Sequence, residues 1–530
     1  MKKWICLVLT LLLIIGSSSG CGGQKAAAPV DHNQVVISIS SEPETLDPCK
    51  GWGHGTTPLV QSTLVEYNRD MTFSDDLATD YSLSDDGLVW TFHLRNDVKF
   101  TDGEALTASD VVFTFMTAKQ SQSSLDLTFL DKAEAPDDFT VVFTLKQPTS
   151  SFLNTVAMVG IVPEHAYADD YGSHPIGSGP FKFVQWNRQE QLILEANPDY
   201  YGQVPAIQKI VMVFQDEDAA FAAVKAGQVD VALTAATLAK QEIPGYNLQA
   251  VTTVDCRGLT LPMTPAEGEL SPSGYPVGND VTCNLEIRQA LAYGMDREMI
   301  ADHAVGGFAT PCYTVNDGFP WNNPETVLET DVEYAKSLLS DKGWADTDGD
   351  GIVEKDGLKA SFTCLYPSGD SVRQAVSMAA AQQAKDLGIE IIVEGTSWDE
   401  ISKRMFSEAV CLGWGNSNPY ESYILYHTSN RCRDDFYNPE AYSNPTVDAY
   451  LEQAMEALSA EEANELWKKA QWDGTTGTAM QGDCPCVFLV NIQHLYYVRE
   501  GLDIGKQQLH PHGASMPLVQ NLKTWSWKEV

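Results

Sequence analysis

Basic residues are scarce in this sequence. Its 530 residues include 34 lysines and arginines against 72 aspartates and glutamates, a formal net charge of −38 at pH 7. A surface this acidic repels nucleic acids and anionic lipids, so we expect no nucleic-acid partner. Hydrophobic residues make up 43% of the chain, enough for large buried cores. The length indicates roughly three domain-sized units.

Long hydrophobic runs are absent after the first fifteen residues. Lys2 and Lys3 precede one apolar run from Trp4 to Ile15. This run is typical of the hydrophobic part of a signal peptide and is shorter than the ~20 residues that a membrane-spanning helix needs. No later segment comes near that length. We therefore expect an extracytoplasmic protein.

Cys21 follows small residues and precedes a Gly- and Ala-rich stretch. This arrangement resembles a bacterial lipoprotein signal, which implies a signal peptide over residues 1–20, lipidation of Cys21 and a tether over 21–34. Anchoring to the cell membrane through the lipid would follow, since two or more acyl chains hold a protein there stably. Ser18 departs from the leucine usual at that position, so secretion without a lipid is the alternative.

Catalytic motifs are also lacking. Beyond residue 20 the sequence contains no G-x-S-x-G, and it contains no H-E-x-x-H; these are the patterns of serine hydrolases and zinc proteases. We therefore predict that the protein is not an enzyme and needs no cofactor. A secreted metal-dependent hydrolase that uses His510 and His512 is a rival hypothesis, and a surface adhesin or sensor is another.

Eleven cysteines are present, and nine remain outside Cys6 and Cys21. An odd number cannot all pair within one molecule. Either some form disulfides or all nine stay reduced, and the candidate pairs are Cys256–Cys283 and Cys411–Cys432. The Cys-Pro-Cys sequence at 484–486 is either two ordinary buried cysteines or a metal or redox site.

The pattern of hydrophobic residues predicts a mixed α/β chain. Thr107 and Asp110 form a capping-box pair ahead of a predicted helix over 108–118. Further expected strands lie at 34–40, 88–100, 139–148, three between 179 and 215, and 486–498; expected helices lie at 284–305, 332–344, 446–458 and 460–471; and α/β units lie at 216–233 and 358–395. This order indicates a two-part body with a sheet-rich insertion at about 85–175, and ligands favour the cleft between such parts.

Five segments then resemble one family in order and spacing. They are "SEPETLDP" (41–48), "SDDGLVWTFHLRNDVKFTDGEALTASDVVFTF" (84–115), "HPIGSGPFKFVQW" (174–186), "EANPDYYGQVPAIQKI" (195–210) and "IRQALAYGMDREMI" (287–300). The chain resembles the peptide- and nickel-binding class, family 5, of extracytoplasmic solute-binding proteins of ABC importers. The resemblance runs from about residue 35 to the C-terminus.

The resemblance implies a two-lobed, type II periplasmic-binding-protein-like α/β fold with a sheet-rich subdomain inserted in the first lobe. Lobe I would cover 35–275 with the insertion at about 85–175, lobe II 283–498, and residues 499–530 would return to lobe I. Such a protein captures a short peptide between its lobes and delivers it unchanged to a permease and ATPase, as a monomer. A nickel or other metal chelate is the alternative ligand.

Three places are candidates for the ligand site. The first is the Gly-rich loop at 46–59 with Trp52 and His54, whose alternative is a surface turn with a packed tryptophan. The second is the segment 411–427. By the resemblance, Trp414, Gly415 and Tyr420 match chelate-contacting residues of the nickel-binding branch. Glu421 would replace the acidic residue that many peptide-binding members use for the peptide amine.

The third place is "LHPHGASMP" (509–517), where His510 and His512 fall on one side of an extended chain. They either contact a metal or metal chelate or take part in a hydrogen-bonded hinge. Arginine is missing between Arg95 and Arg188, although nickel-chelate binders of this class use arginine from the inserted domain. This absence weakens a direct transfer of the nickel site. We favour a peptide ligand because peptide binders form the broad class of this family, and we keep the chelate as the alternative.

Three local motifs have plainer interpretations. Gly177 and Gly179 predict a tight turn before a strand, and Asp296 predicts a helix N-cap. "DTDGDGIVEKDG" (346–357) begins like a calcium-binding EF-hand loop. Its twelfth position is Gly357, however, where that loop needs a bidentate glutamate. We predict an Asp- and Gly-rich hairpin turn, with weak calcium binding as the alternative.

Overall fold

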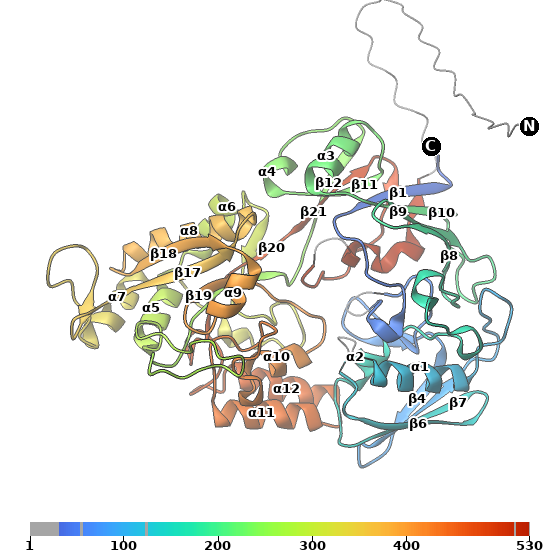
Figure 1. Cartoon of the computed structure of the whole chain (residues 1–530), viewed down its shortest axis with the longest axis horizontal. Coiled ribbons are helices and arrows are strands. Elements are labelled where there is room, and N and C mark those ends of the chain that lie inside the picture. Colours follow the sequence, from blue (N-terminus) through green and yellow to red (C-terminus); the bar gives the residue numbers. More distant parts are fainter. Residues whose placement is uncertain (1–30, 54–56, 122–125, 514–515, 529–530) are drawn as a thin grey trace, which may run out of the picture. The chain divides into compact units, whose positions relative to one another are not determined.

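The computed structural model describes residues 31–53, 57–121, 126–513 and 516–528. Its largest sheet has seven strands, with β1 pairing in parallel with β10 and β11 and the other pairs antiparallel (Figure 1). In spatial order the strands are β12 (Tyr246–Val251), β21 (His494–Arg499), β11 (Val231–Thr234), β1 (Gln34–Ile39), β10 (Lys209–Phe214), β9 (Gln191–Ala196) and β8 (Phe181–Asn187). The strands predicted at 34–40 and between 179 and 215 are thereby confirmed.

A second sheet has six strands. They are β14 (Ala309–Pro311), β20 (Cys486–Ile492), β13 (Cys256–Thr260), β19 (Ala409–Leu412), β17 (Ser361–Pro367) and β18 (Glu390–Thr396). α8 (Ser371–Lys385) connects the parallel pair β17 and β18, so the predicted strand–helix–strand unit is confirmed. The region expected as strand at 486–498 forms β20 in this sheet and β21 in the seven-stranded sheet.

A four-stranded antiparallel sheet forms a separate layer within the first third of the chain. Its order is β4 (Ala78–Leu83), β5 (Val89–Leu94), β7 (Thr140–Leu145) and β6 (Leu130–Asp137). α1 (Ala108–Gln120) packs on it, and Thr107 and Asp110 form the predicted capping box. Phe92, Phe115 and Phe143 belong to the core that this sheet shares with α1. Boundaries of the lobes remain a prediction.

The remaining helices and hairpins surround these three sheets. The helices are α2 (Phe152–Val156), α3 (Glu217–Lys225), α4 (Ala236–Ala239), α5 (Leu285–Gly294), α6 (Arg297–Ala304), α7 (Val332–Asp341), α9 (Trp398–Arg404), α10 (Tyr420–Tyr426), α11 (Pro445–Glu456) and α12 (Ala460–Gln471). The hairpins are β2 (Val65–Tyr67) with β3 (Phe73–Asp75), β15 (Glu354–Lys355) with β16 (Leu358–Lys359), and β22 (Leu502–Asp503) with β23 (Ser526–Trp527). The side chain of Asp296 accepts the Met299 N–H at 2.8 Å, so the predicted N-cap of α6 is confirmed.

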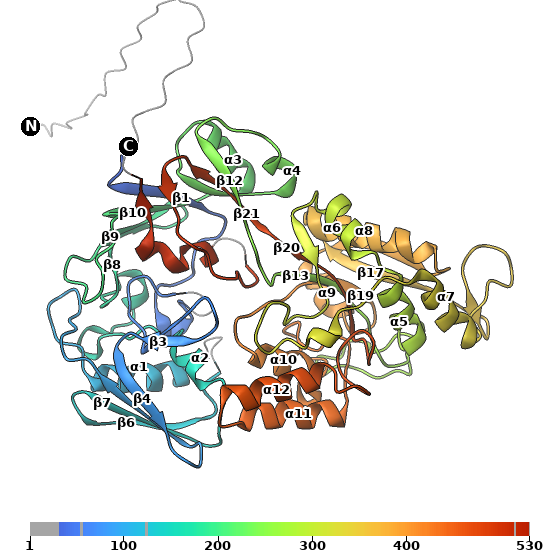
Figure 2. The ribbon, with the colours of Figure 1, turned by 180° about the vertical axis from the view of Figure 1, so that it is seen from behind.

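The C-terminal segment packs on the seven-stranded sheet. Leu518, Val519, Leu522 and Trp525 are buried in the core that also contains Ile37 of β1. In Figure 2 this segment is the red ribbon beside β1 and β10. Within the described ranges, no helix combines the length and the apolar character that crossing a bilayer requires.

The acidic segment at 346–357 forms the predicted turn. Asp346 accepts hydrogen bonds from the N–H groups of Gly349 (2.7 Å) and Gly351 (3.0 Å). The Lys359 ammonium pairs with Asp348 and Asp350. These bonds explain the aspartates and glycines as loop-forming residues.

The nine cysteines that the structure describes are all free thiols, so the candidate pairs Cys256–Cys283 and Cys411–Cys432 are wrong. Cys256 lies in β13, where its Sγ accepts the Trp414 N–H at 3.4 Å, whereas the Cys283 thiol donates to Asp280 O at 3.3 Å. Burial raises the pKa of Cys484 to about 12 and that of Cys486 well above its usual range. Protonated, buried thiols are poor nucleophiles and metal ligands, which favours the interpretation of Cys-Pro-Cys as two ordinary buried cysteines. Cys21 lies outside the described residues.

Gly177 and Gly179 are explained by close packing. Neither has a positive φ. A Cβ at Gly177 would overlap the Val60 carbonyl oxygen, and one at Gly179 would lie 2.8 Å from it. The Gly179 N–H donates to that oxygen at 2.8 Å. Two backbone segments therefore touch here, with no room for a side chain.

We expect Gly177→Ala to lower the free energy of unfolding by about 2 kcal/mol, because the added methyl group forces Val60 away from its position. Urea denaturation followed by circular dichroism measures the change. Ser178→Ala is the matched control, since the buried Ser178 hydroxyl has no hydrogen-bond partner among the described residues and its loss removes no contact. Equal stability of the two variants would contradict the packing argument.

Candidate functional site: the crossing segments and the loop after β19

Three chain segments lie side by side where the two large sheets meet. The chain leaves the seven-stranded sheet at Val251 and enters the six-stranded sheet at Cys256. It returns from the six-stranded to the seven-stranded sheet between Ile492 of β20 and His494 of β21. The third segment is joined to the first by a parallel bridge between Thr253 and His510. The first two segments connect the two sheets directly, and the third lies against the first; together the three are the crossing segments.

Asp255 lies at the centre of the crossing segments. Its side chain is 2% exposed and accepts hydrogen bonds from His494 Nε2 (3.1 Å) and His512 Nδ1 (2.7 Å), and it pairs with Arg257. Burial by itself would raise the pKa of Asp255, but the Arg257 guanidinium and the two histidines hold it well below its usual range. The carboxylate therefore stays charged inside the protein and bonds groups from all three segments.

His510 is fully buried within this network. Its Nδ1 lies 3.2 Å from His494 Nδ1, and its Nε2 lies 3.3 Å from Gln507 Oε1. Burial and the neighbouring His494 lower the pKa of His510 to about 3, so the ring is neutral. These contacts fit the hydrogen-bonded hinge role.

The His512 side chain is 43% exposed and lies against Asp255. Within the described ranges, one group of three or more side chains brings potential metal-ligand atoms within 4.8 Å of one another: Asp346, Asp348 and Glu354. Neither His510 nor His512 belongs to it. Among the described residues, His510 and His512 therefore have no third side chain positioned to complete a metal site with them.

The loop after β19, defined as Trp414 to Glu421 and so including the first two residues of α10, is attached to the crossing segments. The Trp414 carbonyl accepts the Cys256 N–H at 3.0 Å, and the Gly415 carbonyl accepts the His512 N–H at 2.7 Å. Gly415 has φ +146°, and a Cβ there would overlap the Val254 carbonyl oxygen. Only glycine fits this position. The second and third predicted places are therefore in direct contact.

Glu421 points back into its own loop. It is 8% exposed, and its carboxylate accepts the Gly415 N–H at 3.3 Å and the Asn416 N–H at 2.9 Å. Burial raises its pKa to about 7, although the two N–H groups act in the opposite direction. Glu421 thus holds the shape of the loop.

The same loop also contacts residues of the first third of the chain. Tyr67 Oη donates to the Ser417 carbonyl at 2.7 Å, and Asn154 Nδ2 lies 3.4 Å from that oxygen. Tyr420 Oη donates to Asp126 Oδ2 at 3.1 Å. Neither Tyr67 nor Asn154 was predicted as a site residue, because no local pattern marks a residue whose partner lies hundreds of positions away.

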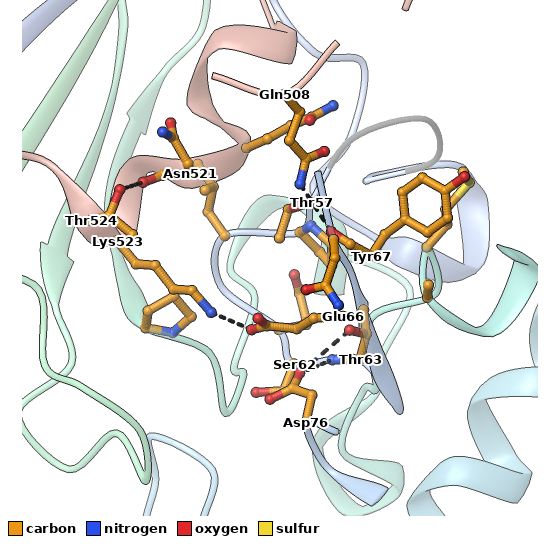
Figure 3. A pocket seen from close by; sticks show the side chains of 18 of the residues that line it. Thr57, Ser62, Thr63, Glu66, Tyr67, Asp76, Gln508, Asn521, Lys523 and Thr524 are labelled. Atoms are coloured by element: carbon orange, nitrogen blue, oxygen red, sulfur yellow. Dashed lines mark hydrogen bonds and ion pairs between the residues drawn. The ribbon is translucent and has the colours of Figure 1, made fainter. Parts of the chain in front are cut away.

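A cavity of about 190 Å³ opens beside Tyr67 and Ser417 (Figure 3). Glu66 pairs with Lys523, and the two side chains meet across the cavity. Asp76 accepts the Thr63 N–H at 3.1 Å. Burial, with a contribution from Glu66, raises the pKa of Asp76 to about 6.

Trp52 is placed apart from the other candidates. It is 5% exposed and packs in the core of the seven-stranded sheet, between Gly51 and Gly53 with positive φ. Its indole N–H has no acceptor among the described residues. His54, its predicted neighbour, lies outside the described residues.

Comparison with known proteins gives several sequence relatives that cover more than four fifths of this chain, among them a Streptomyces and a Bacillus protein. Protein XP55 of Streptomyces lividans is 33% identical over 503 residues, which cover 91% of this chain and 87% of the relative. The oligopeptide-binding protein AppA of Bacillus subtilis is 28% identical, covering 81% of this chain and 84% of AppA.

Solved structures show the same fold. NikZ of Campylobacter jejuni in complex with Ni(L-His) superposes with a TM-score of 0.77 at 22% identity, covering 94% of this chain and all of NikZ. AppA of Bacillus subtilis in complex with a nonapeptide gives a TM-score of 0.70 at 24% identity, covering 94% and 99%. The α/β, type II binding-protein fold that the sequence predicts is confirmed.

The family model for bacterial extracellular solute-binding proteins of family 5 matches residues 72–436. This match spans more than half of the chain and includes the four-stranded sheet, the crossing segment at Asp255 and the loop after β19. Together with the near-full-length relative in Streptomyces, it establishes that the chain belongs to the bacterial extracellular solute-binding proteins of family 5.

Proposed function

We propose that the protein captures an oligopeptide between the parts of the chain built on the seven- and six-stranded sheets, and delivers it unchanged to the permease and ATPase of an ABC importer. Family membership supports the transport role. A peptide is favoured by the curated relatives, which include oligopeptide-binding AppA and a glutathione-binding protein, GsiB, 27% identical over 87% of this chain. Glutathione is itself a tripeptide. No chemistry on the ligand is needed.

The double attachment of the loop after β19 is the observation that carries this proposal. Gly415 is bonded to His512 in the crossing segments, while Ser417 and Tyr420 are bonded to Tyr67 and Asp126. This loop touches two parts of the chain on either side of a hinge. All of its contacts can form together only when those two parts have one particular relative position. A ligand that adds contacts in that position stabilises it, which is how differential binding drives closure.

Within this mechanism the predicted residues divide into two groups. Trp414, Gly415 and Tyr420 are proposed to face the ligand, because they belong to the segment that is bonded both to the crossing segments and to the first third of the chain. Glu421 and His510 are proposed to support it from behind, because each is buried and hydrogen-bonded inside the protein. Trp52, His54 and His512 remain proposed ligand contacts.

We also propose that the protein is a lipoprotein monomer on the outer face of the cytoplasmic membrane or in the periplasm. The positively charged residues, the short apolar run and Cys21 support a cleaved signal peptide with a lipid on that cysteine. A mass increase corresponding to a diacylglyceryl group on an N-terminal Cys21 peptide would test it. An unmodified mature N-terminus would contradict the lipid anchor.

A metal chelate is the alternative ligand. The fold shared with NikZ in complex with Ni(L-His) is compatible with it, although 22% identity supports the fold alone. Native mass spectrometry of freshly purified protein, combined with elemental analysis, separates the two. A ladder of peptide masses supports the proposal. Nickel at about one atom per chain would instead show that the ligand is a metal chelate.

We expect peptide addition to reduce the radius of gyration in small-angle scattering, because closure brings the two parts together. Glutathione, synthetic peptides of increasing length and Ni(II)–L-histidine form the test panel. Tyr67→Phe should weaken binding of the active compound about five-fold, since the Tyr67–Ser417 hydrogen bond is lost in the closed state. Tyr450→Phe is the matched control, because its hydroxyl bonds Asp473 far from this loop. An unchanged profile with every compound would contradict capture by closure.

Glu421 generates a pH prediction. Its folded pKa of about 7 lies above the value of ~4.3 expected in the unfolded chain, so the folded state binds the proton more tightly. The free energy of unfolding of the wild type, measured relative to that of Glu421→Gln, should therefore decrease by about 3 kcal/mol as the pH rises from about 4.5 to 7. Above pH 7 the difference should stay constant. Urea denaturation across that range measures the difference. Glu461→Gln, at an exposed position of α12, is the matched control, and a parallel response of both variants would refute the assignment.

A further inference from the structure

Two buried histidines join the second and third crossing segments. Nδ1 of His494 lies 3.2 Å from Nδ1 of His510. His494 is 2% exposed and His510 is fully buried, so both rings lie inside the protein. Two ring nitrogens at this distance form a hydrogen bond only when one of them carries a proton. The groups at the two ends of the pair decide which nitrogens do.

A tryptophan fixes the end of the pair that faces the C-terminal segment. The indole N–H of Trp525, which can only donate, bonds Asn521 Oδ1 at 2.9 Å. Gln507 Nε2 donates to the same oxygen at 3.0 Å and to Ile504 O at 2.7 Å. These bonds turn the amide oxygen of Gln507 toward His510, whose Nε2 lies 3.3 Å away. Because that oxygen can only accept, His510 Nε2 carries a proton.

Asp255 fixes the other end. Its carboxylate is charged and only accepts, so His494 Nε2, 3.1 Å away, carries a proton. His510 is neutral, because burial and the neighbouring His494 lower its pKa to about 3. With its one proton on Nε2, His510 has a bare Nδ1 that accepts. The proton between the two Nδ1 atoms therefore belongs to His494, whose ring is an imidazolium with Asp255 as its counter-charge.

Titratable and charged groups face the pair from each neighbouring element. Asp255 is the carboxylate in direct contact with His494. The others are Arg257 of β13, His512 of the third segment, Tyr496 of β21 and, around the cavity that His494 lines, Glu217 of α3 with Asp370 and Arg373 at the start of α8.

Loss of the proton on His494 Nδ1 reverses this contact. His494 keeps its Nε2 proton for Asp255, and His510 keeps its Nε2 proton for Gln507, so two bare Nδ1 lone pairs face each other. Either the rings separate or the Gln507 amide turns over, which breaks its bonds to Asn521 and Ile504. The pair thus has two discrete arrangements, which is what a switch requires.

We propose that the hinge formed by the crossing segments is a proton switch: the proton on His494 Nδ1 clamps the second segment to the third, and its release loosens that junction. Backbone bonds hold the first segment to both neighbours in either state, since His510 O accepts the Val254 N–H at 2.9 Å and Asp255 O accepts the Ile492 N–H at 3.0 Å. The switch therefore changes how the hinge is clamped without separating the sheets. It goes beyond the proposed peptide capture and does not depend on which ligand is bound.

Nitrogen NMR of the ligand-free protein labelled with [15N]histidine tests the proposal, with single His→Gln variants assigning the signals. At pH 7 we expect two protonated ring nitrogens on His494 and one, Nε2, on His510. Raising the pH should remove the His494 Nδ1 proton and, at the same pH, shift the backbone N–H signal of His510, which bonds Thr252 O at 3.1 Å. A His494 ring with a bare Nδ1 at pH 7, or loss of that proton with no shift of the His510 backbone signal, would overturn the proposal.

One variant tests the order of the protons directly. Gln507→Met removes the acceptor that keeps the His510 proton on Nε2, so His510 can carry it on Nδ1 and donate to His494. The His494 Nδ1 proton should then be lost at pH 7 and a His510 Nδ1 proton should appear. Gln249→Met, at an exposed position of β12, is the matched control and should keep the wild-type pattern, with circular dichroism checking both folds. The wild-type pattern in Gln507→Met would contradict the switch. Because these measurements contain no ligand, their failure leaves the proposed peptide capture untouched.

Discussion

The buried carboxylate of Asp255 is the interaction on which the arrangement of the two large sheets depends. It bonds His494 on the returning strand, His512 on the C-terminal segment and Arg257 on its own strand. Removing one partner of a buried ion pair leaves an uncompensated charge, which is far more costly than the pair itself is stabilising. All three segments are therefore held in one register where the chain crosses between the sheets.

The loop after β19 extends that register toward the proposed ligand site. Gly415 lies so close to Val254 that a side chain would overlap its carbonyl, and Glu421 closes the loop from inside. The Ser417 carbonyl, in the same loop, accepts a hydrogen bond from Tyr67 in the first third of the chain. Glu421, which the sequence predicts as a ligand contact, therefore holds the backbone of its own loop instead. A buried carboxylate needs hydrogen-bond donors, and the nearest ones here are backbone N–H groups.

Local features of the fold were predictable because their causes lie within a few residues. The capping box of Thr107 and Asp110, the cap at Asp296 and the Asp-rich turn at 346–357 each satisfy neighbouring backbone N–H groups. Longer-range features were not predictable in this way. The apolar run at 486–498 carries no mark at the position where the chain changes sheets, and Gly177 is explained by Val60, a residue of a distant segment.

By itself, the sequence determined the acidic surface charge, the mixed α/β elements and, through the order of several motifs, the resemblance to family 5 that the comparisons establish. Tertiary structure alone decided that His510 is buried beside His494, that Glu421 faces its own loop, and that the cysteines of the described ranges stay unpaired. The reason is physical: hydrogen bonding, burial and thiol pairing depend on distances between side chains, and these distances exist only after segments far apart in the chain have packed together.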